Sequence, residues 1–241
     1  MKVMKRYCLL VVMACLAIGL TAKELPKQGF GLQIGWAQPI LRVNSNTSMD
    51  TLHTTALNGF KVGLTYDASI IAGFGTSIGI NYTMAGGHTN WKSKSPYTVY
   101  PRTRVNTMYH QVELFVDWQY KFEVAKETYL ILYTGPTIQC GIAYNTTELT
   151  ESQNITGDIT PSYVLYDRYT INDANEQLKR LNVTWGVGAG FQYKRYFLRG
   201  GYDFGLIVPY KNADFVNGNH TRGRLDQWNI KVGVYLWYDE D

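Results

Sequence analysis

The stretch MYHQVELFVDWQYKF, residues 108–122, decides the fold. Its bulky apolar side chains fall on alternate positions, namely Met108, Val112, Leu114, Val116, Trp118, Tyr120 and Phe122. Polar residues fill most positions between them, namely Gln111, Glu113, Asp117, Gln119 and Lys121, and Phe115 is the exception. Because successive side chains of a β-strand point to opposite faces, this spacing predicts a strand with one apolar and one polar face.

The same period of two returns along the 241-residue chain. It is clear in residues 181–193 and 227–238, and it is present near 29–38, 58–68, 73–85, 129–144 and 196–206. With residues 108–122 this gives eight segments, each close to the ~9–11 residues that a tilted strand needs to cross a bilayer. The pattern predicts an all-β fold, an eight-stranded antiparallel transmembrane up-and-down β-barrel.

The connections between these segments alternate in length. Short links fall near 69–72, 123–128 and 194–195, and long polar ones near 39–57, 86–107, 145–180 and 207–226. Short periplasmic turns and long extracellular loops are typical of outer-membrane barrels, so we expect four long loops outside the cell. Pro136 lies inside the fifth segment and cannot donate to a sheet ladder, so we expect a bulge or a local break around Gly135-Pro136.

Alternation alone does not say which face points inward, because a soluble lipocalin-like barrel would bury the apolar face. The polar face is rich in glycines and amides, which suit a narrow lumen, and Tyr and Trp stand near strand ends on the apolar face, as in an aromatic girdle. On the predicted register the polar face carries eight charges, namely Lys61, Lys121, Arg199, Lys231, Asp67, Glu113, Asp117 and Asp203. Four cations against four anions suit a dry interior, where an unpaired charge costs several kcal/mol. We therefore expect the polar face inside.

Residues 1–22 are predicted to be a cleaved signal peptide, and residues 23–241 the barrel domain. A basic start with Lys2, Lys5 and Arg6 precedes an apolar run, residues 7–20, that is shorter than the ~20 residues of a membrane-spanning helix. The alternatives are an uncleaved anchor and a lipoprotein cut before Cys15. Cleavage removes three basic and no acidic residues, so the net charge falls from +4 to +1 (4 − 3), which argues against a nucleic-acid partner. It also leaves Cys140 alone, which excludes an internal disulfide, and this side chain shares the apolar face with Ile138 and Ile142.

Four segments resemble the PorT-like outer-membrane β-barrel proteins, which share the architecture of the small OmpA and OmpX barrels. They are GINYTMAGG (79–87), QVELFVDWQYKF (111–122), TGPTIQCGI (134–142) and WGVGAGFQYKRYFLRGGYDFGL (185–206). The end of the chain, WYDED, departs from the family's terminal Phe. The resemblance implies an integral outer-membrane protein and assigns no activity to it.

No constellation predicts an enzyme, a metal site or a cofactor. His53, His88, His110 and His220 lack partners at ligand spacing, and loop decoration is the simpler reading. A hydrolase at the outer rim would have to use His88 or His220 with Asp214, and nothing in the sequence orients them. Eight strands leave an interior just wide enough for side chains, which favours a filled lumen over a narrow channel.

The longest predicted loop holds Tyr163, Tyr166 and Tyr169 in SYVLYDRYT. Tyrosine is favoured at recognition surfaces, while the simpler reading is a hairpin that extends strands five and six above the membrane. We expect a monomeric, non-enzymatic barrel that displays loops for binding, adhesion or envelope integrity. The alternative is a narrow pore or a secretion-associated transport barrel. The expected partners are outer-membrane lipid, the barrel-assembly machinery during insertion, and an extracellular ligand that the sequence does not identify.

Overall fold

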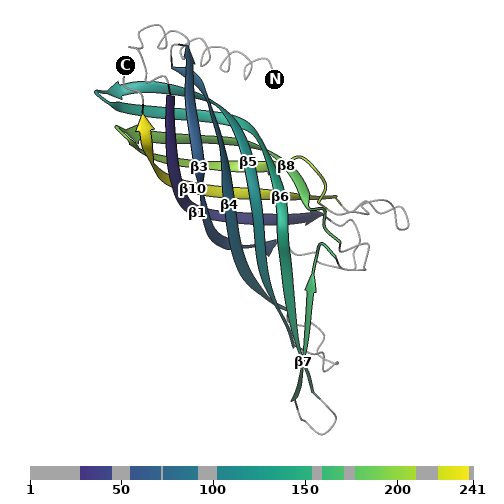
Figure 1. The fold of residues 1–241 in the computed structure, drawn as a ribbon. Coiled ribbons are helices and arrows are strands. Elements are labelled where there is room, and N and C mark those ends of the chain that lie inside the picture. Colours follow the sequence, from purple (N-terminus) through teal and green to yellow (C-terminus); the bar gives the residue numbers. More distant parts are fainter. Residues whose placement is uncertain are drawn as a thin grey trace, which may run out of the picture.

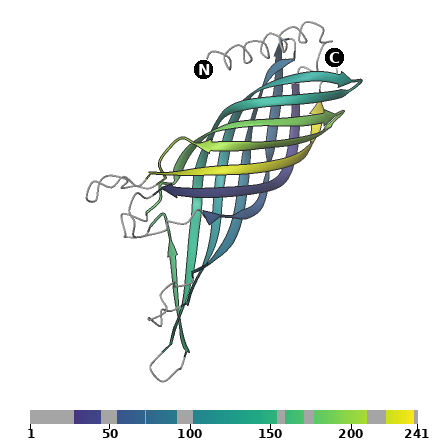
Figure 2. The ribbon, with the colours of Figure 1, turned by 180° about the vertical axis from the view of Figure 1, so that it is seen from behind.

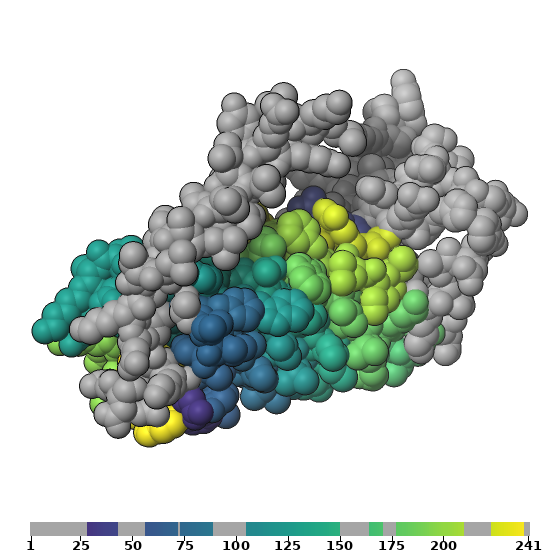
Figure 3. All heavy atoms as spheres, turned by 90° about the horizontal axis from the view of Figure 1, so that it is seen from above, coloured from purple at the N-terminus to yellow at the C-terminus, as the bar shows by residue number. Residues whose placement is uncertain are grey.

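Eight antiparallel strands close into a ring. They are β1 (Gln28–Asn44), β3 (Asn58–Ile71), β4 (Phe74–Trp91), β5 (Arg102–Ala125), β6 (Thr128–Gln153), β8 (Leu181–Tyr193), β9 (Tyr196–Gly205) and β10 (Arg222–Tyr238). Neighbours in the ring follow this order, and β1 pairs with β10 to close it (Figure 1). In the view from above, the purple first strand lies against the yellow last strand (Figure 3). The predicted eight-stranded up-and-down barrel is confirmed.

The computed structural model describes residues 28–44, 55–71, 73–91, 102–153, 159–170, 177–209 and 222–238. The predicted signal peptide, His53, Asp214 and His220 lie outside these ranges. No helix within them is both long enough and apolar enough to cross a membrane.

Several strands extend further than the sequence pattern predicted. β5 begins at Arg102 and β6 ends at Gln153, well into the segments expected to be loops. A short strand, β2 (Thr55–Ala56), pairs with β1, and β7 (Ile159–Asp167) pairs with β6 inside the longest predicted loop. The prediction failed here because it required alternating apolar residues, whereas a strand outside the bilayer needs only ladder partners.

The apolar face points outward, as predicted. In β5, Leu114 is 48% exposed while its neighbour Phe115 is 3% exposed, and the same alternation runs through the barrel strands. Most outward apolar residues, and Cys140 with them, are exposed or partly exposed, whereas the inward polar residues are buried. A soluble barrel would show the reverse, so this surface matches a wall that faces lipid.

Large inward rings lie over inward glycines of neighbouring strands. Phe115 lies against Gly79, Phe197 against Gly233, and Tyr133 against both Gly188 and Gly201. In each case a β-carbon on the glycine would overlap the ring or its hydroxyl, so the aromatic side chains fill space that the glycines leave. Much of the lumen is packed in this way.

The ladder between β5 and β6 is interrupted at Pro136, as expected. Pairing stops at Phe115↔Thr137 and resumes in the same register at Trp118↔Thr134, so the interruption is a break and not a bulge. On the other side β6 stays paired with β8 through Pro136↔Trp185. The missing donor of proline therefore affects one neighbour only.

Two adjacent glycines test this packing. A β-carbon at Gly201 would lie 2.6 Å from the Tyr133 hydroxyl and 2.9 Å from the Val187 carbonyl oxygen, whereas at Gly200 its nearest neighbour lies 3.8 Å away. We expect Gly201→Ala to lower the free energy of unfolding by about 1–3 kcal/mol. Gly200→Ala should be neutral or raise it by up to about 1 kcal/mol, because alanine restricts the unfolded chain. Urea titration in lipid vesicles, followed by tryptophan fluorescence, measures both, and equal effects would contradict the proposed packing.

Candidate functional site

One carboxylate, Asp67, gathers the polar groups in the half of the lumen beside the short turns. In outer-membrane barrels this is the periplasmic half, and the half beside the long connections is the outer half. Its Oδ2 lies 2.7 Å from Arg199 Nη2 and 3.1 Å from Lys121 Nζ. It also accepts hydrogen bonds from the Tyr235 hydroxyl at 2.5 Å and, through Oδ1, from the Ser77 hydroxyl at 2.7 Å. The four strands that supply these groups lie around the ring, so the cluster ties opposite walls together.

A second carboxylate, Glu113, gathers the polar groups in the outer half of the lumen. Lys61 Nζ lies 2.6 Å from its Oε2, and Thr83 donates to its Oε1 at 2.9 Å. The amides of Gln111 and Gln227 donate to the same oxygen at 2.5 and 3.0 Å. Because charged and neutral donors share each carboxylate, the two clusters satisfy both buried anions without solvent.

The remaining predicted charges lie between these clusters. Asp203 accepts from the amides of Asn229 at 3.0 Å and Gln227 at 3.4 Å, and Lys231 stands 4.9 Å from the centre of the Phe115 ring. Neither Asp203 nor Asp117 forms a direct ion pair with any residue that the structure describes. All eight predicted lumen charges are nonetheless buried, each at most 8% exposed.

These central groups line a small cavity. A cavity of about 10 Å³ is lined by Asp117, Asp203 and Lys231, among others, and by Tyr133, whose hydroxyl has no hydrogen-bond partner among the described residues. That volume admits about one water molecule. The middle of the lumen therefore offers no continuous aqueous path through the part of the chain that the structure describes.

An apolar cluster, here the outer cap, closes the end of the ring with the long connections. Its members are Leu41, Leu57, Ala85, Tyr109, Tyr144, Tyr169 and Leu178. Tyr169 and Leu178 lie between β7 and β8 in the sequence. Nearby, Arg180 donates to the carbonyls of Gly141 at 3.2 Å and Ile142 at 2.7 Å. Burial raises the pKa of the Tyr169 hydroxyl, so this ring stays neutral over the barrel.

Stacked rings close the periplasmic end. Phe197 and Tyr235 have ring centres 4.9 Å apart, and Tyr235 stacks on Tyr238 at 5.2 Å. Gln192 joins this layer by donating to the Tyr238 hydroxyl at 2.7 Å. The described part of the lumen is thus occluded at both ends as well as in the middle.

The three tyrosines predicted for recognition have different surroundings. Tyr169 is 5% exposed in the outer cap, so it is unavailable to a partner, and the expectation for this residue is corrected. Tyr166 is half-buried and donates to Glu148 at 2.7 Å. Tyr163 lies on β7 opposite Leu149, and its side chain is outside the described set. A tyrosine in a predicted loop was taken to be exposed, but the returning segment folds Tyr169 back over the barrel.

The histidines do not converge within the described residues. His88 is exposed, and the Nδ1 of His110 lies 2.6 Å from the Tyr82 hydroxyl. The described residues hold no group of three or more His, Cys, Asp or Glu side chains that could bind a metal ion.

Three barrel strands continue beyond the barrel and form one sheet with β7, here called the projecting sheet. It consists of 87–91 of β4, 102–107 of β5, 141–153 of β6, and β7. β6 loses its β8 partner after Cys140, and its remaining 13 residues run for roughly 40 Å at about 3.3 Å per residue. Figures 1 and 2 show these strands extending far past the rest of the ring. A hairpin was expected to extend the fifth and sixth barrel strands, β6 and β8. A hairpin is present, but it is formed by β6 and β7, and β8 takes no part in it.

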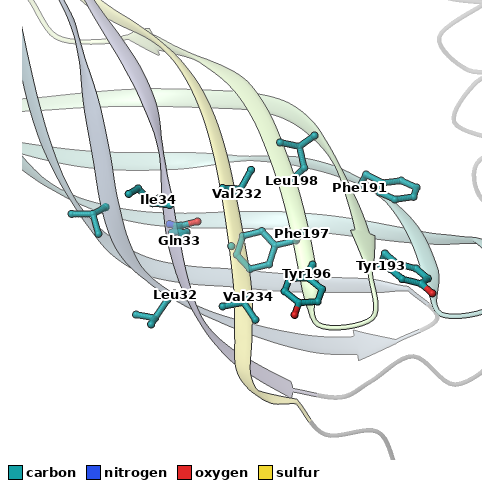
Figure 4. Close-up of a pocket in the computed structure, with 12 residues that line it drawn as sticks. Leu32, Gln33, Ile34, Phe191, Tyr193, Tyr196, Phe197, Leu198, Val232 and Val234 are labelled. Atoms are coloured by element: carbon teal, nitrogen blue, oxygen red, sulfur yellow. The ribbon is translucent and has the colours of Figure 1, made fainter.

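The lipid-facing surface of the barrel wall carries a shallow apolar hollow of about 590 Å³ (Figure 4). Leu198 and Val232 line it from β9 and β10, and Tyr193 and Tyr196 stand beside the turn between β8 and β9. The hollow opens on the lipid-facing side, so we assign its lining to contact with acyl chains and not to a soluble ligand.

The sequence pattern missed Asp226. This residue is fully buried although it shares the outward face with Trp228 and Ile230. Arg42 and Arg224 each place Nε 2.9 Å from its Oδ2. Asp226 lies one position before the predicted strand 227–238, and its register partner in β1, Ile40, lies in the predicted loop 39–57. The spacing of neighbouring residues therefore did not indicate that Asp226 is buried.

Comparisons with known proteins give one matching family model and several similar solved structures. The family model described as "outer membrane protein beta-barrel domain" matches residues 28–208. The solved structure of Ail, the attachment invasion locus protein of Yersinia pestis, in complex with the heparin analogue sucrose octasulfate, is 10% identical, with 87% of this chain and 99% of that chain covered and a TM-score of 0.38. Neisserial surface protein A is 15% identical, with 86% of this chain and 97% of that chain covered and a TM-score of 0.37. The CymD monoaromatic hydrocarbon channel is 6% identical, with 87% of this chain and 89% of that chain covered and a TM-score of 0.35. No curated protein sequence matches the chain.

The Asp67 cluster gives a direct stability test. Asp67→Asn leaves Arg199 and Lys121 buried without their shared anion, so we expect a loss of about 3–5 kcal/mol in the free energy of unfolding. The matched control is Glu127→Gln, which breaks a half-exposed ion pair with Lys194 at 3.6 Å and should cost less than about 1 kcal/mol. Urea titration in vesicles separates the two, and a small loss for Asp67→Asn would mean that the cluster is not dry.

Proposed function

The chain belongs to the outer membrane protein β-barrel family, and from this premise we propose a non-enzymatic, non-conducting barrel that carries a binding sheet outside the cell. Its place is the outer membrane, as the family implies. The observation that carries the proposal is the pairing of a filled lumen with the projecting sheet. A lumen packed with ion clusters leaves no room for a substrate or a solute, whereas the sheet offers a large surface.

The projecting sheet has properties of a protein-binding surface. β7 pairs with β6 along one edge, and no described strand pairs with its other edge. Val164 and Leu165 are 52% and 72% exposed on its two faces. An open strand edge with exposed apolar side chains can accept an extended segment of another protein as an additional strand. We therefore assign binding to the sheet, with Tyr166 and Tyr163 on the same strand as candidate contacts.

The finer assignments are proposals of the same kind. The resemblance of four segments to PorT-like proteins supports membership of that group. We further propose that residues 1–22 serve as a cleaved signal peptide, and that the folded barrel is a monomer in outer-membrane lipid after insertion by the barrel-assembly machinery. An extracellular protein is the partner that the strand edge favours.

The first prediction concerns conduction. The purified barrel in a planar lipid bilayer should give no steady single-channel openings, because the lumen is occluded at three levels. Double substitution Tyr169→Ala and Leu178→Ala thins the outer cap alone and should leave the bilayer silent, since the ion clusters below remain. Reproducible openings of the unmodified barrel would favour the transport alternative.

The second prediction concerns the sheet. Replacing residues 146–166 by Asn-Gly removes Tyr163, Val164, Leu165 and Tyr166 and joins Asn145 to Asp167, which are paired in the native hairpin, through a two-residue turn. The shortened protein keeps Tyr169 and Leu178, so it should fold and remain heat-modifiable on a gel. A non-adherent bacterium that expresses the full chain should attach to cultured epithelial cells, and the shortened chain should lose most of that attachment. Equal attachment by both forms would contradict binding through the sheet.

A further inference from the structure

Two arginines stand side by side on the outer wall, at the seam that closes the barrel. Arg42 of β1 and Arg224 of β10 are register partners, and their side chains are 45% and 48% exposed. They lie at the end of the barrel with the long connections, which is the outer end. Neither takes part in the lumen clusters or in the projecting sheet.

The pair is held by a buried anion. Asp226 is fully buried, and its Oδ2 forms ion pairs with Nε of both arginines at 2.9 Å. It also accepts hydrogen bonds from the Tyr202 hydroxyl at 2.6 Å and from the Gly205 amide at 2.9 Å. In both guanidinium groups the ion-pair contact with Asp226 is made by Nε. Arg42 Nη2 lies 3.4 Å from the Tyr202 hydroxyl, and the Nη groups of Arg224 bond to no described residue. Two cations on one anion leave a local charge of +1.

The wall below the arginines is apolar and aromatic. Trp36 and Trp228 are exposed on the same outward face, and Ile230 and Ile34 continue it toward the membrane centre. Arg224 is four residues from Trp228, which places it about 9 Å above that ring along the membrane normal, at about 3.3 Å per residue and a tilt near 45°. Tryptophans of the girdle lie at headgroup level, so the guanidinium groups reach into the headgroup layer.

From this geometry we propose that Arg42 and Arg224 form a binding site for the phosphate of lipid A, the phosphorylated glucosamine lipid of the outer leaflet. Guanidinium groups match phosphate oxygens in geometry and charge. A phosphate with acyl chains beneath it uses both the arginines and the apolar wall, whereas a soluble phosphate would use the arginines alone. The outer end of the barrel faces the outer leaflet, whose phosphate-bearing amphiphile is lipid A. Asp226 fixes the spacing of the two arginines before the lipid arrives.

The test uses the folded full-length barrel in detergent and native mass spectrometry of retained lipid. The probes are bis-phosphorylated lipid A, the same lipid without its phosphates, and phosphatidylglycerol. We expect the unmodified barrel to retain one bis-phosphorylated lipid A about tenfold better than the dephosphorylated form, the size expected for one or two charged hydrogen bonds. Equal retention of these two forms would overturn the site, and equal retention of phosphatidylglycerol would overturn the assignment to lipid A.

Arg224→Gln is the central variant, because Asp226 stays paired with Arg42 and the local charge becomes zero. It should abolish most of the preference for the phosphorylated form. Lys126→Gln is the control, since it removes one charge from an exposed turn at the periplasmic end and should retain the preference. A second variant, Arg42→Gln with Arg224→Gln and Asp226→Asn, removes both arginines without leaving a buried anion, and it should behave like Arg224→Gln. Heat-modifiability on a gel confirms folding for each, and an unchanged preference in either arginine variant would overturn the proposal.

Discussion

The pairing of β1 with β10 is the constraint on which the rest of the structure depends. It removes both edges of the barrel sheet, so the backbone groups of the eight strands find partners within the wall and the inner face is separated from solvent. A charged side chain that points inward must then be stabilised within the lumen, because an unpartnered buried charge costs several kcal/mol. Asp67 and Glu113 meet this requirement by gathering donors from several strands each.

The same closure explains why the lumen is packed and not open. Eight strands enclose an interior about as wide as two opposing side chains. Where Tyr133 or Phe115 enters it, the facing positions are glycines, and the remaining central cavity is about 10 Å³. An interior held by ion clusters and interlocked rings resists rearrangement. Binding is therefore assigned to surfaces outside the lumen, where a partner displaces only water or lipid.

Period-two alternation was enough to predict the eight strands and their two faces, and the missing donor of Pro136 was enough to predict a bulge or a local break there. Each of these depends on residues that are neighbours in sequence. Alternation did not predict the lengths of β5 and β6, since those ends leave the bilayer and need no apolar face. It also did not predict the partners of the lumen charges. Arg199 and Asp67 are separated by 132 positions, and only the register of the closed ring brings them to 2.7 Å.

Asp226 shows a different limit. Asp226 is two positions from the outward-facing Trp228, so it belongs to the lipid-facing side of β10, where a carboxylate is unfavourable. It is tolerated there because Arg42 and Arg224 form ion pairs with it. Arg42 is separated from Asp226 by most of the chain, so the sequence alone gives no reason to associate them. A charge that breaks the outward apolar pattern near a strand end is nevertheless a useful signal, because such a residue must have partners that some other strand supplies.

The order of strands also separates the two proposed binding surfaces. The arginine pair lies at the seam between β1 and β10, while the longest strands of the projecting sheet, β5 and β6, lie on the opposite side of the ring. A partner bound at the tip of the sheet would exert force on β5 and β6 from a point roughly 40 Å beyond the barrel, given a strand rise of about 3.3 Å per residue. A lipid headgroup held at the opposite wall would resist the tilt that this load produces. Because the packed lumen joins the two walls rigidly, a lipid site placed there can steady the sheet without contacting it.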